Sequence, residues 1–322
     1  MKNSACVLML LATLVPAAAF AVETYPMRPV RMIIPAAAGG VTDILGRVVA
    51  QKLAESLGQQ VIVDNRPGAS GMIGSQIVAK ATPDGHTLLM VFPSHPVNPS
   101  LYPDDIPYDT LKAFAPITMV SGVAPVLLVN SQSPARSVQD LINLARAKPG
   151  QLNAAAAGSG SMGSLAAELL RSLTGISFTK VVYKGAPQAL SALIAGEIDF
   201  YFIGSASTAA AQVKAGRVRA VGVGGKERAA ALPDVPPIGD TIPGFEARGW
   251  NGILAPAATP KTIIERLHRE LVKIIHSSDF GQILAREGAT PVGNTPAEFE
   301  AVIRADVAKW AKIIRESGIK AQ

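Results

Sequence analysis

Short runs of β-forming residues alternate with amphipathic segments along most of this chain, and this alternation constrains the fold more than any other feature. The first unit runs from a predicted strand at 30–34, through a glycine-containing turn, into a predicted helix that ends at Gly58. Further strands are predicted at 61–63 and 87–91, with a helix at 72–80 between them. Strands that alternate with helices through short turns are typical of a parallel sheet, so the sequence predicts an α/β fold.

A second set of alternating elements follows residue 137. Its predicted strands lie at 153–157, 178–182, 198–202 and 218–223, and its predicted helices at 137–148, 164–173, 187–195 and 206–214. The apolar run at 114–130 is long enough to leave one lobe and enter the next, and residues 250–255 suit a return strand before a helix predicted at 262–275. Two α/β lobes joined by two crossing strands would form a hinge with a cleft between them.

The first 21 residues have the features of a signal peptide. Lys2 gives a cationic start, residues 7–19 are apolar, and residues 19–21 (AFA) form a small-x-small cleavage site. The apolar run is too short to span a bilayer and is broken by Pro16, so we expect cleavage and export to the periplasm. The predicted organisation is a signal peptide at 1–21, a discontinuous first domain at 22–122 and 252–322, and a second domain at 123–251.

Composition excludes several classes of function. Cys6, the only cysteine, lies in the predicted leader, which excludes disulfides, thiolate metal sites and a cysteine nucleophile from the mature chain. The formal net charge is +6, but the basic residues are scattered and aromatic residues make up 5%, so no basic stripe for nucleic acid is present. No other apolar stretch approaches about 18 residues, so we expect a protein that is not embedded in the membrane.

Three glycine- or serine-containing turns place free backbone amides between a predicted strand and the start of a predicted helix. They are residues 38–43 (AGGVTD), 158–164 (GSGSMGS) and 183–186 (YKGA). A helix N-terminus carries unpaired N–H groups and a partial positive charge, which suits a carboxylate or a phosphate. Because ligands of open α/β sheets bind at the carboxyl ends of the strands, the three turns together favour an anion site over simple turn and capping roles.

Signatures of cofactor and metal chemistry are weak. Residues 158–163 (GSGSMG) match a dinucleotide fingerprint, but the next predicted strand ends without the acidic residue that would bind a ribose. None of the four histidines forms a metal-binding motif. Glu168 and Asp199 are interpreted as solvated or capping carboxylates, and Trp250 as a buried anchor. We therefore predict no cofactor and no metal.

Catalysis remains an alternative at two serines. Ser94 and His95 are predicted to lie in a loop and to hydrogen-bond a ligand, with no oriented acid partner evident in the sequence. The main alternative is a secreted α/β hydrolase that uses Ser94 or Ser159. A protein-interaction module whose cleft is filled by side chains is a further alternative.

Nine short motifs carry a resemblance to a known family. They are 25–31 (YPMRPVR), 38–43 (AGGVTD), 63–69 (VDNRPGA), 83–85 (PDG), 94–102 (SHPVNPSLY), 114–117 (FAPI), 183–185 (YKG), 232–236 (LPDVP) and 255–260 (APAATP). In these motifs the chain resembles the Bug family, the substrate-binding receptors of tripartite tricarboxylate transporters, and the similarity covers essentially the whole mature chain. The resemblance implies a two-lobed periplasmic-binding-protein fold, a type II-like Venus flytrap with two crossing hinge strands.

Members of this family hold a ligand carboxylate largely through backbone amides and ordered waters near the first strand–helix loop. The resemblance implies ligand-binding positions at Ala36, Ala38, Gly39, Gly40, Thr42 and Asp43 in the first lobe, Ser94 and His95 at the side of the cleft, and Ser159, Met162, Gly163, Ser164, Tyr183, Gly185, Ile203 and Gly204 in the second lobe. It also implies a monomer whose partners are a small organic acid and the membrane permease subunits of a transporter. A sensor that presents the loaded receptor to a signalling protein would use the same closure of two lobes around the acid and is an alternative.

The chain departs from the family pattern at two places. Ala36 and Ala37 stand where the family commonly has Phe and Pro, which would open or reshape the cleft. Ile203 and Gly204 stand where the family often has Asp and Asn. Because an ammonium group buried without a partner is costly, Ile203 predicts a carboxylic acid that lacks an amino group and carries an apolar or aromatic body.

Overall fold

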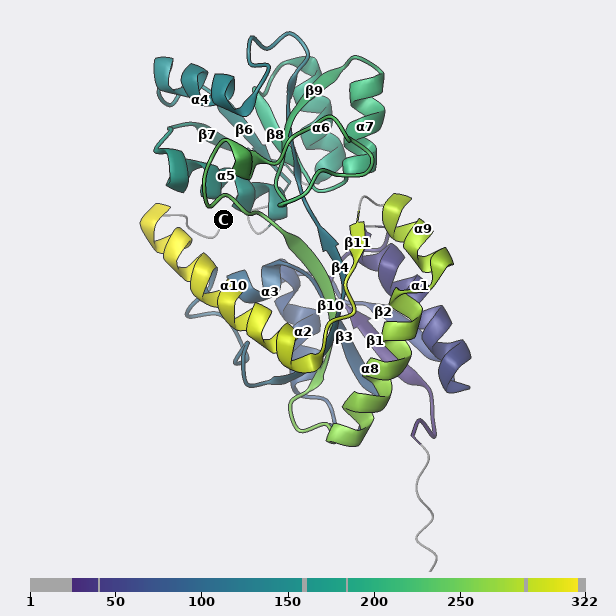
Figure 1. The fold of residues 1–322 in the computed structure, drawn as a ribbon. Helices are drawn as coiled ribbons and strands as arrows, with labels where there is room; N and C mark the ends of the chain where they lie inside the picture. Colours follow the sequence, from purple (N-terminus) through teal and green to yellow (C-terminus); the bar gives the residue numbers. More distant parts are fainter. Residues whose placement is uncertain (1–24, 40, 158–160, 184, 287–288, 318–322) are drawn as a thin grey trace, which may run out of the picture.

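The computed structural model describes residues 25–39, 41–157, 161–183, 185–286 and 289–317, which form two α/β lobes (Figure 1). The predicted signal peptide with Cys6, and the predicted site residues Gly40 and Ser159, lie outside the described residues. None of the described helices combines the length and apolarity that a bilayer crossing needs.

Most elements expected from the sequence are confirmed to within about two residues. The strands are β1 (Val30–Ile34), β2 (Val61–Asn65), β3 (Thr87–Val91), β4 (Phe114–Val123), β5 (Val126–Asn130), β6 (Asn153–Ala156), β7 (Thr179–Val182), β8 (Phe200–Ile203), β9 (Val218–Val223), β10 (Gly249–Pro256) and β11 (Ala289–Pro291). The helices are α1 (Val41–Leu57), α2 (Met72–Ala79), α3 (Ser94–Leu101), α4 (Val138–Ala147), α5 (Met162–Thr174), α6 (Ala186–Ala195), α7 (Ala206–Lys214), α8 (Lys261–Ile275), α9 (Ser278–Arg286) and α10 (Pro296–Ser317).

The first lobe is built on a six-stranded sheet in the order β11-β4-β10-β3-β1-β2. β1 pairs in parallel with β2 and with β3, as the sequence predicted, whereas β10 and β11 run antiparallel to their neighbours. Met32 and Ile34 of β1 pack into one hydrophobic cluster with α1 and α8, and Ile33 packs into another with α2 and α10. Successive side chains of a strand point to opposite faces, so this sheet is buried on both sides.

The second lobe is built on a five-stranded sheet in the order β7-β6-β8-β5-β9. β6 lies parallel to β7 and β8, and β5 lies antiparallel to β8 and β9. Leu127 and Val129 of β5 face the cluster that contains α4 and α5, while Val126 and Leu128 face the cluster that contains α6 and α7. Both lobes therefore have the predicted α/β construction, with helices on both faces of each sheet.

Two chain segments cross between the lobes and lie against each other. The predicted crossing strand at 114–130 is two strands, β4 in the first sheet and β5 in the second, interrupted at Pro125, which has no N–H to donate. On the return path, the amide of Gly224 donates to the carbonyl of Pro125 (2.7 Å) and the amide of Ala247 donates to the carbonyl of Gly224 (2.9 Å). The domain limits given above remain a proposal; β4 ends at Val123 and β10 begins at Gly249.

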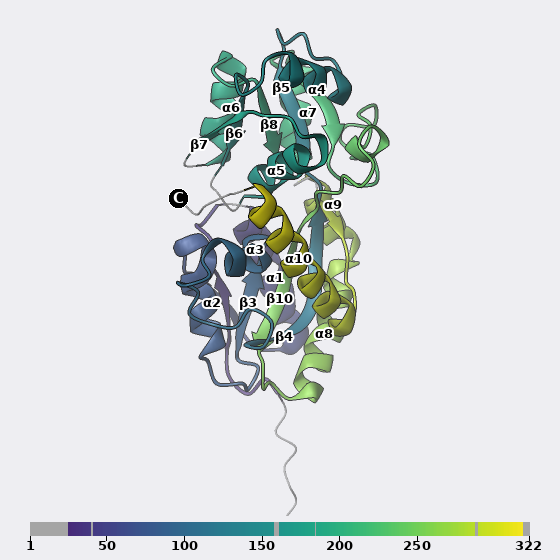
Figure 2. The same ribbon diagram turned by 90° about the vertical axis from the view of Figure 1, so that its left-hand side faces the viewer.

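Helix α10 forms a third link between the lobes that the sequence did not reveal. Its N-terminal half contributes Phe299 and Ile303 to a first-lobe cluster. Its C-terminal half contributes Trp310 and two isoleucines to the cluster that contains α5 of the second lobe. Lys309 also donates to the carbonyl of Glu246 at 2.6 Å. Figure 2 shows α10 lying across the first lobe and ending beside α5.

The contact at Gly224 generates a prediction about the hinge. A Cβ at this position would lie 2.9 Å from the carbonyl oxygen of Ala247 and 2.9 Å from Cγ of Pro125. We expect Gly224→Ala to lower the free energy of unfolding by about 1–3 kcal/mol, because the two crossing segments must move apart. Urea denaturation measures the change. Gly281→Ala is the control, because a Cβ there would meet no atom within 4 Å; equal effects of the two changes would contradict the prediction.

Candidate functional site

Two adjoining cavities, of about 640 and 490 Å³, lie between the lobes and share part of their lining. We call them together the interlobe cleft. The residues common to both are Val41, Thr42, Phe92, Pro93, Met162, Ala186 and Gly204. Because these residues come from both lobes, a molecule held here would contact both.

Helix N-termini surround the interlobe cleft. Residues at or within the first turns of α1, α3, α5, α6 and α7 line it, among them Thr42, Ser94, Gly163, Pro187 and Thr208. These helices follow β1, β3, β6, β7 and β8 along the chain, so the carboxyl ends of the parallel strands of both sheets face the cleft. The unpaired N–H groups and the dipoles of these helices make the cleft favourable for an anion.

The remaining lining is uncharged and largely apolar. Among the described residues that line the cleft, none is Asp, Glu, Lys, Arg or His. Apolar walls are formed by Ile44, Phe92, Val123, Leu190 and Ile203. Hydroxyl-bearing residues of the lining are Thr42, Ser70, Ser94, Ser161, Tyr201, Ser205 and Thr208. Such a site can bind an anionic group through amides and hydroxyls while an apolar body lies against the walls.

Asp43 holds the first loop in shape instead of lining the cleft. Its buried carboxylate accepts hydrogen bonds from the amide of Gly39 (2.8 Å), from Arg47 (3.0 Å) and from Asn65 (2.9 Å). Burial alone would raise the pKa of Asp43, but the hydrogen bonds from these three groups bring the pKa below its usual value. Asn65 also donates to the carbonyl of Ala36 at 3.1 Å. Asp43 is therefore a positioning residue for the turn at Gly39, whose φ of +84° favours glycine.

Thr42 connects the cleft to the hinge. Its hydroxyl donates to Oδ1 of Asn251 at 3.0 Å, and Nδ2 of Asn251 donates to Ser121 at 3.3 Å. Asn251 belongs to β10 and lines the cleft, and Ser121 belongs to β4. Neither residue was singled out from the sequence, because their side chains meet Thr42 only through pairing of distant strands.

The start of α5 requires glycine at position 163. The hydroxyl of Ser161 caps the helix by accepting from the amide of Ser164 at 3.2 Å. A Cβ at Gly163 would lie 2.1 Å from the carbonyl oxygen of Phe202, so only glycine lets this helix turn lie against the end of β8. Met162 and Gly163 line the cleft, whereas Ser164 is buried outside its lining.

The structure corrects the predicted loop at Ser94 and His95, which form the first turn of α3. Prolines suggested a turn at this point, but proline is compatible with the first turn of a helix. Ser94 lines the cleft and its hydroxyl donates to the carbonyl of Ser70 at 2.8 Å. His95 does not line the cleft, because its side chain is 2% exposed and packs against Tyr108 and Phe114.

The other predicted positions divide between the cleft and its surroundings. Gly39, Ile203 and Gly204 line the cleft. Phe92 and Pro93 also line it; they were not predicted from the sequence, although they follow a predicted parallel strand. The predicted residues Ala36, Ala38, Tyr183 and Gly185 are not among the lining residues. Gly185 is the N-cap of α6, whose first residue, Ala186, lines the cleft in its place.

Three side chains interpreted from the sequence have structural roles. Glu168 is 1% exposed and pairs with Arg171 (3.0 Å) and Lys180 (3.2 Å), so the interpretation of a solvated or capping carboxylate is wrong for this residue. Asp199 accepts from the backbone amide of Asn153 at 2.7 Å. Trp250 is confirmed as a buried anchor, and its Nε1 donates to Asp306 at 2.7 Å. Among the described residues, no group of three or more His, Cys, Asp or Glu could hold a metal ion.

Comparison with protein families gives one match that covers most of the chain. A family described as "Tripartite tricarboxylate transporter family receptor" matches residues 45–319. A curated relative, protein BugT of Bordetella pertussis, is 36% identical over 307 residues, which is 94% of each chain. A second relative, from Pseudomonas sp. strain P51, is 36% identical over 301 residues, or 93% of this chain and 89% of the relative.

Solved structures of similar proteins agree with the fold. The R. palustris protein Rpa4515, solved with adipate, is 31% identical with a TM-score of 0.81, covering 92% of this chain and all (100%) of that one. The periplasmic binding protein BugD is 30% identical with a TM-score of 0.78 over 92% and 100% of the two chains. MatC of Rhodopseudomonas palustris, solved with malate, is 29% identical with a TM-score of 0.77 over 90% and 100%.

The burial of His95 generates a prediction about pH. Burial lowers the pKa of His95 from 6.5 to about 4. The unfolded chain therefore binds a proton at this residue between about pH 6.5 and 4 while the folded protein does not, so the free energy of unfolding falls as pH falls through this window, by up to about 3 kcal/mol. We expect His95→Phe to remove this part of the pH dependence. Urea denaturation at pH 7 and pH 4 measures it.

The exposed His276 provides the control for this measurement. His276→Gln should leave the difference in unfolding free energy between the two pH values as it is in the wild type. If His95→Phe shows the same difference in unfolding free energy between pH 7 and pH 4 as the wild type, burial of His95 is not the cause of that difference.

Proposed function

This chain belongs to the receptor family of tripartite tricarboxylate transporters, and on that premise we propose that its interlobe cleft captures a small organic acid that lacks an amino group. In this proposal, capture takes place in the periplasm, and the receptor then delivers the acid to the membrane subunits of such a transporter. The observation that carries the proposal is a cleft whose described lining residues are uncharged and which is surrounded by helix N-termini from both lobes. These N-termini favour the carboxylate, and no described lining residue offers a counter-charge for an ammonium group.

Capture in this proposal is a conformational event and involves no chemical step. The carboxylate would contact Gly39 and Thr42 in the first lobe and the starts of α5 and α7 in the second. Contacts to both lobes favour the closed form over the open form, because a ligand shifts an equilibrium only through its different affinity for the two states. The membrane subunits would then receive the closed, loaded receptor.

Ile203 and its neighbours support the proposal that the ligand lacks an amino group. The side chain of Ile203 is 2% exposed and lies in an apolar part of the lining near Leu190. The acids bound in two similar structures, adipate and malate, both lack an amino group. These observations support a simple organic acid over an amino acid as the ligand of this chain.

Ser94 gives no comparable support to the hydrolase alternative. Its hydroxyl hydrogen is donated to the carbonyl of Ser70, an arrangement that orients the side chain but does not activate it as a nucleophile. His95, the adjacent candidate base, packs among aromatic rings.

Native mass spectrometry of protein purified without refolding tests the proposed function. We expect a co-purifying organic acid at one molecule per chain. Calorimetry with that acid should give one site, and aspartate and glutamate should give no binding under the same conditions. Tight binding of aspartate or glutamate, with no response to simple organic acids, would contradict the proposal.

Substitution of Ile203 tests the electrostatic part of the proposal. A carboxylate about 5 Å from the ligand carboxylate, at an effective dielectric constant of about 20, would oppose binding by about 3 kcal/mol. We therefore expect Ile203→Asp to weaken binding of the co-purifying acid roughly 100-fold. Ile203→Asn has a similar volume without the charge and should weaken binding much less. Equal losses for the two variants, both shown by circular dichroism to be folded, would contradict this explanation.

A further inference from the structure

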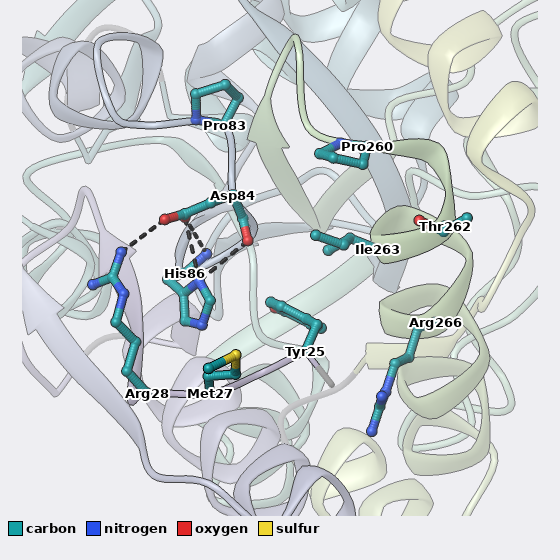
Figure 3. Close-up of a pocket in the computed structure, with 10 residues that line it drawn as sticks. All are labelled: Tyr25, Met27, Arg28, Pro83, Asp84, His86, Pro260, Thr262, Ile263 and Arg266. Carbon is teal, nitrogen blue, oxygen red and sulfur yellow. Dashed lines mark hydrogen bonds and ion pairs between the residues drawn. The ribbon is translucent and has the colours of Figure 1, made fainter. Parts of the chain in front are cut away.

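A separate cavity of about 740 Å³ (Figure 3) lies on the first lobe. It lies at the end of the first lobe remote from the interlobe cleft. Its lining comes from residues 25–28 before β1, residues 83–86 before β3, and the start of α8 at 260–266. β1 and β3 begin at this cavity and end at the cleft, and five residues of strand span about 16 Å. We call this cavity the basal pocket.

The basal pocket gathers three sequence motifs that the cleft does not use: 25–31, 83–85 and 255–260. Their mutual contacts fix its shape. The hydroxyl of Tyr25 donates to the carbonyl of Gly85 at 2.7 Å, and Arg28 pairs with Asp84 at 2.7 Å. Gly85 has a φ of +79°, and a Cβ there would lie 2.5 Å from Ile263. The pocket is therefore formed in advance of any partner.

The basal pocket has an excess of groups that favour a negative charge. Arg28 and Arg266 stand on opposite sides of it, with Tyr25 and Met27 between them (Figure 3). Arg28 forms an ion pair with Asp84, which partly neutralises its charge. Arg266 has no ion pair or hydrogen bond with a described residue. The N-terminus of α8 adds a partial positive charge. Nε2 of His86, a lining residue, is buried and has no hydrogen-bond partner among the described residues.

The rest of the basal pocket is apolar and in part exposed. Met27 is 61% exposed, and Tyr25, Pro83, Pro260 and Ile263 form the walls. Tyrosine, methionine and arginine are enriched at protein–protein interfaces, where apolar anchors fill pockets and charged groups surround them. This combination fits a peptide segment that pairs an apolar side chain with a carboxylate.

We propose that the basal pocket docks an acidic, apolar segment of the transporter's membrane component, with an apolar side chain against Tyr25 and Met27 and an adjacent carboxylate on Arg266. This inference rests on the proposed function. Every residue of the pocket belongs to the first lobe, so the contact persists while the second lobe moves. The pocket therefore anchors the receptor in the open and closed states alike, and recognition of the loaded form falls to other surfaces.

Gene replacement in the source bacterium tests the docking site. The readout is uptake of the carbon-14-labelled organic acid that co-purifies with the wild-type receptor. We expect Arg266→Glu to slow uptake at least 10-fold and Met27→Ser to slow it less, while the purified variants bind the acid and unfold in urea as the wild type does. Arg217→Glu, an equal charge change at an exposed arginine of the second lobe, is the control and should leave uptake unchanged.

Genetic suppression, uptake rates and ligand binding distinguish docking from other roles of the basal pocket. Second-site mutations in the membrane subunits that remove an acidic residue and restore uptake by Arg266→Glu would support docking. Normal uptake by both pocket variants would overturn it. If a second equivalent of the acid binds the wild type but not Arg266→Glu, the pocket is a small-molecule site and docking is overturned. If the wild type binds phosphatidylglycerol vesicles and Arg266→Glu does not, the pocket is a lipid site and docking is likewise overturned. Failure of the proposed function is a separate result: wild-type receptor that binds no organic acid.

Discussion

The function proposed for this molecule depends on the attraction between an anion and helix N-termini that face one space, where no described lining residue carries a charge. Parallel strands of both sheets end at the interlobe cleft, and the helices that follow them begin there. Unpaired amides in a site of low polarity can stabilise a carboxylate without a fixed counter-ion. The neighbouring carboxylate of Asp43 does not oppose this, because Arg47, Gly39 and Asn65 satisfy it. Within the described part of the chain, the electrostatics of the cleft thus come from backbone geometry more than from charged side chains.

The same geometry connects the site to the parts that would move. Thr42 bonds Asn251 on β10, and Asn251 bonds Ser121 on β4, so the first loop is tied to the two strands that lead into the hinge. On the second lobe, α5 places its first turn in the cleft and packs its body with Trp310 of α10. A rotation of the lobes must therefore accommodate both the contact at Gly224 and the shared hydrophobic cluster, which restricts the motions that can bring the lobes together.

The two ends of the first lobe have different chemistry, and this suits two different partners. At the carboxyl ends of β1 and β3 the described lining is uncharged and both lobes contribute, so binding there would depend on the lobe arrangement. At the amino ends the basal pocket is basic, apolar and confined to one lobe, so binding there would not depend on that arrangement. In the two proposals made above, one short sheet therefore separates a ligand site whose binding would depend on lobe closure from a docking surface whose binding would not.

The sequence by itself determined the alternation of strands and helices, the two lobes and the turn at Gly39. These are local features: Ser137 caps α4 by accepting from the amide of Asp140, as its spacing predicted, and Gly39 provides a positive φ that few other residues tolerate. Only the tertiary structure decided that His95 faces a core while Ser94 faces the cleft, that Asn251 supports Thr42, and that α10 joins the lobes. The physical reason is that these outcomes depend on contacts between residues far apart in the chain, whose geometry no local pattern specifies.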